Sequence, residues 1–328
     1  MSLTSVIIPA YNVASDLGSL LPNILANALV HEIIIVDDCS TDETAQVAAG
    51  WAERTGKVKL ISLPANGGAG QARNAGMKAA TGRYLYFLDA DDRLSPGAID
   101  IVTTHLEETG SDVMVFKYRQ VTKDQGGASP MIPIDQKAWS AICGSEKRRV
   151  VSLSEAGRLL FTVNFPWNKV IRRDFCEASG LSFSETRVHN DVYAHWHIYL
   201  KARTIGLLNL ELIDHVTAPE SNQLSNLFSR QRFDIFEAVN AVEVLFSSLP
   251  ASYRKHYVWF LAFKMDIFCW IYPRLSSELR EEFCDLVEES FQSFTEADYF
   301  SAHSIERQCA LTSLYLKYAP RLVFDSIR

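Results

Sequence analysis

The chain has 328 residues, of which 48% are hydrophobic and 22% charged, and this ordinary globular balance excludes a mostly disordered protein. The 32 Lys and Arg against 39 Asp and Glu give a net charge of −7, which excludes the broad cationic field that nucleic-acid binding as a main role requires. Six cysteines without a CxxC pair predict reduced thiols in a cytoplasmic protein.

The first third of the chain alternates between strand and helix patterns. Continuous apolar runs at Ser5–Ile8 and Glu32–Val36 are typical of strands that are buried on both faces of a parallel sheet. Apolar residues recur at helical spacing from Leu17 to Leu25. The series continues with expected strands at Val58–Leu63, Tyr84–Leu88 and Asp112–Tyr118 and an expected helix at Gly70–Ala80. This alternation predicts a doubly wound, mostly parallel α/β sheet.

Two patterns predict where helices begin. Ser40 followed by Glu43 forms a capping box, and Ser95-Pro96 offers an N-cap and a proline for the first turn. The alternation stops at the loop-like stretch Lys123–Pro130, and a last strand is expected at Thr204–Ile213. We therefore expect three regions, residues 1–120, residues 121–220 and a helix-rich C-terminal extension at residues 221–328.

The most apolar late stretch, Tyr257–Tyr272, is too short to span a bilayer and is interrupted by Lys264 and Asp266. Two interpretations remain open. The stretch is either a buried helix of the core or a surface that touches a membrane through its aromatic side chains, Trp259, Phe260, Phe263, Phe268 and Trp270.

Polar residues follow each of the first four expected strands. Because ligands bind at the carboxyl ends of the strands in an open α/β sheet, these residues are expected to meet at one edge. The four clusters are Pro9-Ala10-Tyr11-Asn12, Asp37-Asp38, Asn66-Gly67-Gly68-Ala69-Gly70 and Asp89-Ala90-Asp91-Asp92. Their convergence predicts a ligand site more strongly than any of the clusters does by itself.

The acidic cluster suits a divalent cation. Asp89 and Asp91 lie two residues apart, so on an extended backbone they face the same cleft, where two like charges repel unless a cation lies between them. Carboxylate oxygens favour Mg²⁺ or Mn²⁺. The structural alternative is an exposed acidic turn after a strand.

The other clusters suit a nucleotide. Asp38 can accept hydrogen bonds from a heterocycle and Tyr11 can stack on its ring. The stretch from Gly68 to Arg73 misses the dinucleotide fingerprint, because it lacks the third glycine and follows the third strand. It is either a turn that lets the backbone approach a ligand, with Arg73 as donor, or a plain helix start.

The second half offers three further candidates. Trp167-Asn168-Lys169 suits a polar, sugar-like ligand, or is a helix start with a core tryptophan. Asp191 opens an aromatic helix, where it is either an N-cap or a general base whose pKa is raised by partial burial. His215 is either a ligand or a structural histidine.

Together these motifs resemble the inverting glycosyltransferases of family 2, which have the GT-A fold, a Rossmann-like sheet. The resemblance is specific over Thr4–Gly97 and continues more thinly to about Asn222, whereas we recognise no motif in the last hundred residues. The matching motifs are Val6–Asn12, Val36–Asp42, Asn66–Asn74, Phe87–Asp92, Trp167–Arg173 and Asn190-Asp191.

The resemblance implies a nucleotide-sugar donor, most often a UDP-sugar, together with Mn²⁺ or Mg²⁺ and a glycan or lipid-linked glycan acceptor. It implies donor residues in 1–120, namely Pro9, Tyr11, Asn12, Asp38, Asn66, Gly70, Arg73, Asp89 and Ala90. It implies metal ligands among Asp89, Asp91 and His215, acceptor contacts at Trp167, Asn168, Lys169 and Asn190, and Asp191 as the catalytic base. The protein is then expected in the cytoplasm or on the inner face of the membrane, as a monomer or a homo-oligomer.

Three departures from the family pattern bear on this interpretation. Asn190 stands where many relatives have an acidic residue, and Cys39 stands where glycine is commoner. The stretch Asp214–Asn226 lacks the usual Tyr- and Arg-rich pattern. Asn190 leaves open a non-catalytic nucleotide-sugar-binding or scaffolding subunit of a polysaccharide assembly complex. The sheet leaves open a nicotinamide oxidoreductase, against which the misplaced Gly-x-Gly argues.

Overall fold

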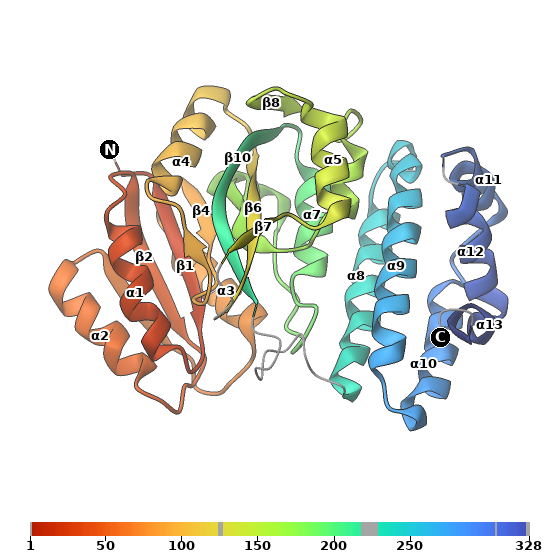
Figure 1. Cartoon of the computed structure of the whole chain (residues 1–328), viewed down its shortest axis with the longest axis horizontal. Helices are drawn as coiled ribbons and strands as arrows, with labels where there is room; N and C mark the ends of the chain where they lie inside the picture. Colours follow the sequence, from red (N-terminus) through yellow and green to blue (C-terminus); the bar gives the residue numbers. More distant parts are fainter. Residues whose placement is uncertain (1, 124–126, 218–228, 306, 326–328) are drawn as a thin grey trace. The chain divides into compact units, whose positions relative to one another are not determined.

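The computed structural model describes residues 2–123, 127–217, 229–305 and 307–325. The chain divides into two compact units, one made of Met1–Ala156 and Thr162–Pro219 and the other of Gly157–Phe161 and Glu220–Arg328. The first is an α/β unit and the second is helical (Figure 1). The predicted division of residues 1–220 into two halves stays a prediction, and the expected boundary at 220/221 lies outside the described residues.

One ten-stranded sheet forms the centre of the α/β unit. Its strands are β1 (Thr4–Ala10), β2 (Val30–Asp37), β3 (Val58–Ser62), β4 (Tyr84–Phe87), β5 (Arg93–Leu94), β6 (Val113–Thr122), β7 (Ala128–Pro130), β8 (Arg148–Val151), β9 (Lys169–Arg172) and β10 (Ile205–Thr217). The order is β3-β2-β1-β4-β9-β6-β10-β5, with β7 beside β6 and β8 beside β10. Its helices are α1 (Ala14–Leu25), α2 (Thr44–Thr55), α3 (Ala69–Ala79), α4 (Ala98–Thr109), α5 (Pro133–Cys143), α6 (Arg173–Ser179) and α7 (Val192–Lys201).

The sheet is mixed rather than mostly parallel. Strands β1 to β4 pair in parallel, as do β6 and β10, whereas β5, β7, β8 and β9 pair antiparallel. Parallel pairing needs a long crossover connection, which the helices between β1 and β4 supply. Strand β7 follows β6 closely and pairs with it antiparallel, as a short connection requires. The stretch Lys123–Pro130 was expected to be a loop, but its last three residues form this strand.

The register of the buried strands explains why their carboxyl ends meet at one edge of the sheet. Ile7 of β1 lies beside Ile34 of β2 and Phe87 of β4, and all three side chains are fully buried. Their register brings the carboxyl ends of the three strands to one edge, and the segments that follow them carry the polar clusters expected from the sequence.

Both predicted helix starts are wrong. Helix α2 begins at Thr44, and the Ser40 hydroxyl accepts a hydrogen bond from the backbone N–H of Asn12 instead of capping the helix. Helix α4 begins at Ala98 after Gly97, whose positive φ of 72° is a conformation that serine and proline avoid. In both places, local contacts between neighbouring loops outweigh the capping preference.

The second unit contains helices and short 3-10 turns in its described residues. They are η1 (Gly157–Phe161), η4 (Arg230–Phe233), α8 (Asp234–Ser248), η5 (Ala251–His256), α9 (Tyr257–Ile271), η6 (Tyr272–Arg274), α10 (Ser277–Ser290), α11 (Glu296–Ile305), α12 (Arg307–Tyr318) and α13 (Pro320–Asp325). Helix α9 is central, because Phe260 and Phe268 are fully buried within the unit. This confirms the buried-helix interpretation of Tyr257–Tyr272. Among the described helices, none has the length and apolar character needed to cross a bilayer.

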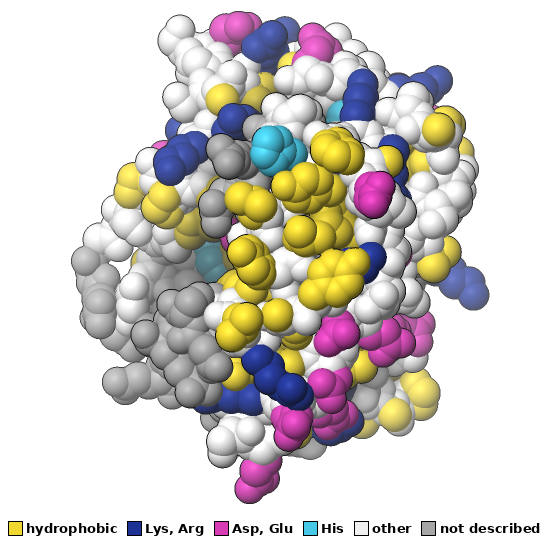
Figure 2. Space-filling view, turned by 90° about the vertical axis from the view of Figure 1, so that its right-hand side faces the viewer, with side chains coloured by type: hydrophobic (Ala, Val, Ile, Leu, Met, Phe, Trp, Pro, Cys, Tyr) yellow, Lys and Arg dark blue, Asp and Glu magenta, His cyan; other side chains and the backbone are white. Residues whose placement is uncertain are grey.

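One face of the helical unit is apolar although it is exposed. Figure 2 shows hydrophobic side chains gathered on this face, and α11, α12 and α13 carry several of the most exposed apolar residues, namely Phe300, Tyr315, Tyr318 and Leu322. Because Phe260, Phe263 and Phe268 are buried, they are not free to touch a membrane. A peripheral membrane contact elsewhere and a homo-oligomer stay predictions.

Candidate functional site

The loops after β1 and β2 are held in unusual backbone conformations. Asn12, Cys39 and His189 are the non-glycine residues with positive φ among those described, at 54°, 62° and 60°. Each is next to an expected site residue, Tyr11, Asp38 or Asn190. The left-handed conformation of Cys39 explains why glycine is commoner at this position in the family it resembles. Such strained conformations concentrate at functional sites.

Asp38 fixes the glycine loop that precedes α3. Its two carboxylate oxygens accept hydrogen bonds from the backbone N–H groups of Gly67 and Gly68, at 2.8 and 2.7 Å. The neighbouring Asp37 accepts a hydrogen bond from Ser40 N–H within the turn that follows β2. The Asp38 carboxylate therefore joins the ends of β2 and β3, and the proposed contact with a heterocycle stays a prediction.

The loop after β1 presents an exposed aromatic ring. Tyr11 is half exposed, whereas the Asn12 side chain accepts a hydrogen bond from Thr41 N–H at 2.8 Å and so ties the loop after β1 to the loop after β2. Pro9 lies within β1 opposite Val36. The exposed ring is available for stacking, and the amide group of Asn12 is used to hold the loops together.

Gly70 is needed where α3 meets the segment before α7. A Cβ atom on Gly70 would lie 1.9 Å from the backbone oxygen of Ser184 and 3.0 Å from the Asn190 Cβ atom. Asn66 accepts a hydrogen bond from the Arg187 side chain in the same segment. The glycine loop and residues 184–190 are therefore packed directly against each other.

Arg73 is the centre of the site. Its guanidinium donates to Asn190 Oδ1 at 2.7 Å and to Asp89 Oδ1 at 2.6 Å, and it lies 5.4 Å from the centroid of the Phe183 ring. Arg73 is only 4% exposed, and its Nε atom is buried without a hydrogen-bond partner. Arg73, a buried cation, thus joins two other expected site residues, Asp89 and Asn190, from distant parts of the sequence.

Asp191 occupies the N-cap position of α7, but its side chain makes no capping hydrogen bond. Desolvation by burial raises the pKa of its carboxyl group, an effect that the Arg73 guanidinium opposes. A carboxylate that is not used for capping and has a raised pKa suits a general base.

A second cluster joins the acidic turn to β10. Asp92 Oδ1 lies 2.9 Å from His215 Nδ1 and accepts from Val216 N–H at 3.0 Å, while Asp92 Oδ2 is buried without a partner. Burial raises the pKa of Asp92 to about 7, although the bond to His215 opposes the shift. The Trp167 ring stacks on His215 at 5.0 Å. Asp92 was not among the expected site residues, although it adjoins Asp91.

The expected metal ligands are not assembled into a cluster. In the part of the chain that the structure describes, no group of three or more His, Cys, Asp or Glu side chains is placed to hold an ion. Asp89 is paired with Arg73, Ala90 is buried, and Asp91 is exposed in the turn. The donor set still fits Mg²⁺ or Mn²⁺, because such an ion is commonly held by one or two carboxylates together with substrate phosphates.

The expected acceptor residues lie in the interior. Trp167, Asn168 and Lys169 are 1%, 3% and 1% exposed, in the 3-10 turn η2 (Pro166–Asn168) and at the start of β9. The Tyr118 ring meets the Trp167 ring edge-on, with 5.1 Å between the ring centroids. The Tyr118 hydroxyl donates to the buried Asp135 of α5 at 2.9 Å, and Asp135 also accepts from Val163 N–H at 3.2 Å. Asp135 and Tyr118 were not expected from the sequence, where no pattern distinguishes them from other residues of a helix and a strand.

A protein-family model and curated relatives match the sequence of this chain. The model described as "Glycosyl transferase family 2" matches residues 5–178, more than half of the chain. A Bacillus subtilis protein named "Uncharacterized glycosyltransferase EpsJ" is 29% identical over 221 residues, 67% of this chain and 62% of that protein. The Staphylococcus aureus poly(ribitol-phosphate) β-N-acetylglucosaminyltransferase TarS is 26% identical over 76% of this chain and 42% of its own length. The chain thus spans less than two thirds of these relatives.

Solved structures share the fold. Residues 1–349 of S. aureus TarS in complex with UDP-GlcNAc align over 97% of this chain and 88% of that chain, with a TM-score of 0.76 and 22% identity. The same portion of TarS in complex with UDP aligns with a TM-score of 0.72, 21% identity and the same coverage. At this level of identity, the likeness establishes the GT-A fold.

Proposed function

The chain belongs to glycosyl transferase family 2, and on that premise we propose that it is an inverting transferase that moves a sugar from a UDP-sugar to a hydroxyl group of a glycan or a lipid-linked glycan. The UDP and UDP-GlcNAc complexes of TarS, which has the same fold, support a uridine nucleotide as the donor. The observation that carries the proposal is the carboxylate of Asp191, which is not used to cap α7.

In the proposed reaction, Asp191 takes the proton of the acceptor hydroxyl as its oxygen attacks the anomeric carbon of the sugar. A carbon–oxygen bond forms on one face of that carbon, and the bond to the diphosphate oxygen breaks on the opposite face. UDP leaves with the electron pair, so the configuration inverts. Because burial raises the pKa of Asp191, its carboxylate is a stronger base than an exposed aspartate.

The other site residues bind and orient the donor. The half-exposed Tyr11 ring is placed to stack on the nucleobase, and Arg73 holds Asp89 for contact with the ribose. A Mg²⁺ or Mn²⁺ ion would be held through Asp91, with His215 as a second ligand. Once bound, the ion stabilises negative charge on the leaving diphosphate.

Titration calorimetry with UDP, GDP, CMP and NAD⁺, each with and without Mn²⁺, tests the donor class. We expect UDP to bind most tightly and Mn²⁺ to raise its affinity. Preferential binding of NAD⁺ would favour the oxidoreductase alternative. Absence of binding by every nucleotide would contradict the proposed donor site and favour a scaffolding subunit.

A further inference from the structure

A pocket of about 370 Å³ lies between α5 and the strands β6, β7 and β10 of the α/β unit. This volume is within the usual range of sites for small ligands. The polar and aromatic side chains that line it are Lys117, Gln136, Trp139, Ser140, Asn209 and Glu211. Its described walls contain none of the donor, metal or acceptor residues that were expected from the sequence. The pocket and the candidate site are therefore built from different residues.

Two amide side chains of the pocket are held through their NH₂ groups. Gln136 Nε2 donates a hydrogen bond to Met131 O at 2.5 Å, and Asn209 Nδ2 donates one to Glu146 O at 3.0 Å. In the part of the chain that the structure describes, neither amide oxygen has a hydrogen-bond partner. An amide that is fixed through its nitrogen keeps its oxygen as an acceptor, so these two residues suit a ligand that donates hydrogen bonds.

Trp139 and Ser140 of α5 add an aromatic ring and a hydroxyl group to the wall of the pocket. Trp139 is only 5% exposed, and its indole N–H has no hydrogen-bond partner among the described residues. Among the same residues, the Ser140 hydroxyl has none either. Because a buried tryptophan usually pairs its N–H group, the indole offers a ligand both an apolar ring and an unused donor.

The charges that line the pocket cancel each other. Lys117 Nζ of β6 lies 4.0 Å from Glu211 Oε1 of β10, which is the distance of an ion pair. The register of β10 against β6 shifts on both sides of Glu211. Such irregularities re-aim side chains and are common next to binding sites. With one cation and one anion, the lining has no excess charge with which to hold a phosphate or a carboxylate group.

This combination of side chains fits a neutral sugar residue better than other small ligands. A nucleotide or a sugar phosphate would bring negative charge to Glu211 without a spare cation, and burial of an unpaired charge is costly. An apolar ligand would leave the amide oxygens and the Ser140 hydroxyl without partners. A sugar ring has hydroxyl groups that donate and accept hydrogen bonds, and C–H faces that can pack against an indole.

We propose that this pocket binds one neutral sugar residue of a glycan, as a non-catalytic subsite of the α/β unit. The inference rests on the proposed function for its ligand, because it gives part of the glycan acceptor a place outside the reacting centre. The pocket shares elements with the candidate site. Asp135 of α5 accepts a hydrogen bond from Tyr118 OH of β6, and the Tyr118 ring meets Trp167 edge-on. Helix α5 and β6 thus line the pocket and also support the Trp167 ring.

Nuclear magnetic resonance of the tryptophan side chains tests the inference. The chain has six tryptophans, so protein labelled with ¹⁵N-tryptophan gives six indole N–H signals, and Trp139→Phe identifies the signal of Trp139. The neutral disaccharides cellobiose, lactose and N,N′-diacetylchitobiose are added at millimolar concentrations without a donor. We expect at least one of them to move the Trp139 signal in a saturable way, which gives its dissociation constant.

Substitutions of exposed residues on α5 separate binding in the pocket from other effects. Ser140→Tyr adds a ring to the lining and should weaken disaccharide binding by at least about tenfold. Gln136→Ala removes one acceptor and should weaken it several-fold. Ala141 is exposed and does not line the pocket, so Ala141→Tyr is the matched control and should keep the wild-type dissociation constant. All three variants should keep the wild-type affinity for UDP.

The failure of this inference and that of the proposed function are distinguishable. A Trp139 signal that none of the sugars moves, or a dissociation constant that Ser140→Tyr leaves unchanged, would overturn the inference. A shift confined to the Trp167 signal would also overturn it, because the sugar would then lie at the candidate site. A saturable Trp139 shift in a protein that binds no nucleotide would support the pocket and contradict the proposed donor site.

Discussion

Each of the two units buries a lysine completely, and the two lysines differ in how they are paired. In the helical unit, Lys264 of α9 donates to Glu243 Oε1 of α8 at 3.1 Å and to the backbone oxygen of Ser290. In the α/β unit, Lys169 donates to neutral oxygens and acts on its carboxylates through space. The first pairing is a direct ion pair, and the second leaves a carboxylate for another partner.

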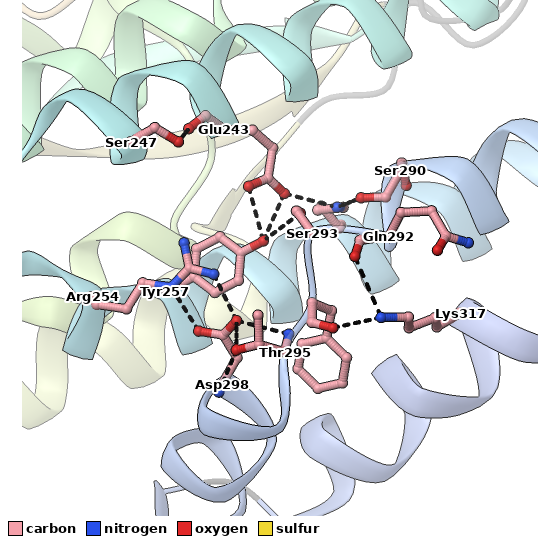
Figure 3. Close-up of polar contacts among 12 residues, drawn as sticks. Glu243, Ser247, Arg254, Tyr257, Ser290, Gln292, Ser293, Thr295, Asp298 and Lys317 are labelled. Atoms are coloured by element: carbon pink, nitrogen blue, oxygen red, sulfur yellow. Dashed lines mark hydrogen bonds and ion pairs between the residues drawn. The ribbon is translucent and has the colours of Figure 1, made fainter. Parts of the chain in front are cut away.

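The surroundings of the two lysines extend this contrast. Around Lys264, Tyr257 OH donates to Glu243, and the Arg254 guanidinium binds both carboxylate oxygens of Asp298 at 2.6 Å (Figure 3). At the sheet edge of the α/β unit, Asp92 Oδ2 and Tyr86 OH are buried without hydrogen-bond partners. A satisfied network stabilises a fold, whereas a buried polar atom without a partner costs free energy unless a water molecule or a ligand pairs with it.

Removing the lysine of the satisfied network should have the largest effect on stability. Lys264→Met leaves the Glu243 carboxylate beside Tyr257 without its cation, so we expect the free energy of unfolding to fall by about 3–5 kcal/mol. Urea unfolding followed by circular dichroism measures the change. The control, Lys255→Met, removes an exposed lysine of the same unit, and its effect should stay within about 0.5 kcal/mol. Equal effects of the two substitutions would contradict the contrast.

A substitution in the glycine loop should lower the unfolding free energy by less and should also weaken the binding of the donor. In Gly70→Ala, the new Cβ atom would lie 1.9 Å from Ser184 O, so α3 must shift away from residues 184–190. We expect a loss of about 1–3 kcal/mol in unfolding free energy and a weaker affinity for UDP by calorimetry. Gly18→Ala is the control, because its Cβ atom would meet no atom within 4 Å. An unchanged affinity in a destabilised Gly70→Ala would separate this loop from the donor site.

In the α/β unit, the hydrogen-bond network around Glu32 is also satisfied. Removing the charge of Glu32 should have the smallest effect on the unfolding free energy. Although burial opposes the shift, hydrogen bonds from Lys59, Thr81 and Ser5 lower the pKa of Glu32 to about 2 from an ordinary value of 4.5. Because the folded pKa is below the unfolded one, its contribution is present above pH 4.5 and is lost as the pH falls toward 2. After allowance for the exposed Lys59, we expect about 1–2 kcal/mol.

Glu32→Gln provides the comparison for this prediction. Unfolding free energies of wild type and variant should differ most at neutral pH and converge as the pH falls to about 2. A difference that stays constant across this range would mean that the charge of Glu32 is not what stabilises the fold.

The sequence predicted the first four strands of the sheet well and several later features poorly. Strands such as β1 and β2 are continuous Ile and Val runs whose burial on both faces leaves few alternatives. Strand β9 has only four residues and lies between β4 and β6, far from both in sequence, so its place depends on tertiary contacts. The expected departure at Asp214–Asn226 lies partly outside the described residues.

The site residues likewise divide into those that the sequence predicts and those whose place depends on tertiary contacts. The convergence of Arg73 and Asp89 follows from the parallel strands and could be predicted. The bond from Arg73 to Asn190 joins residues 117 positions apart and gives a structural role to the asparagine that departs from the family pattern. Asp135 could not be predicted, because one aspartate in the first turn of a helix is ordinary in sequence and only its burial beside Tyr118 distinguishes it.

The most direct test of the central claim is the rate of UDP release by Asp191→Asn, measured together with its affinity for UDP. Asparagine has the shape of aspartate but cannot accept the acceptor proton. We predict that turnover falls by about 10²–10⁴-fold while the dissociation constant for UDP stays within about twofold of wild type. Turnover within a few-fold of wild type, with the same UDP affinity, would contradict the assignment of Asp191 as the base.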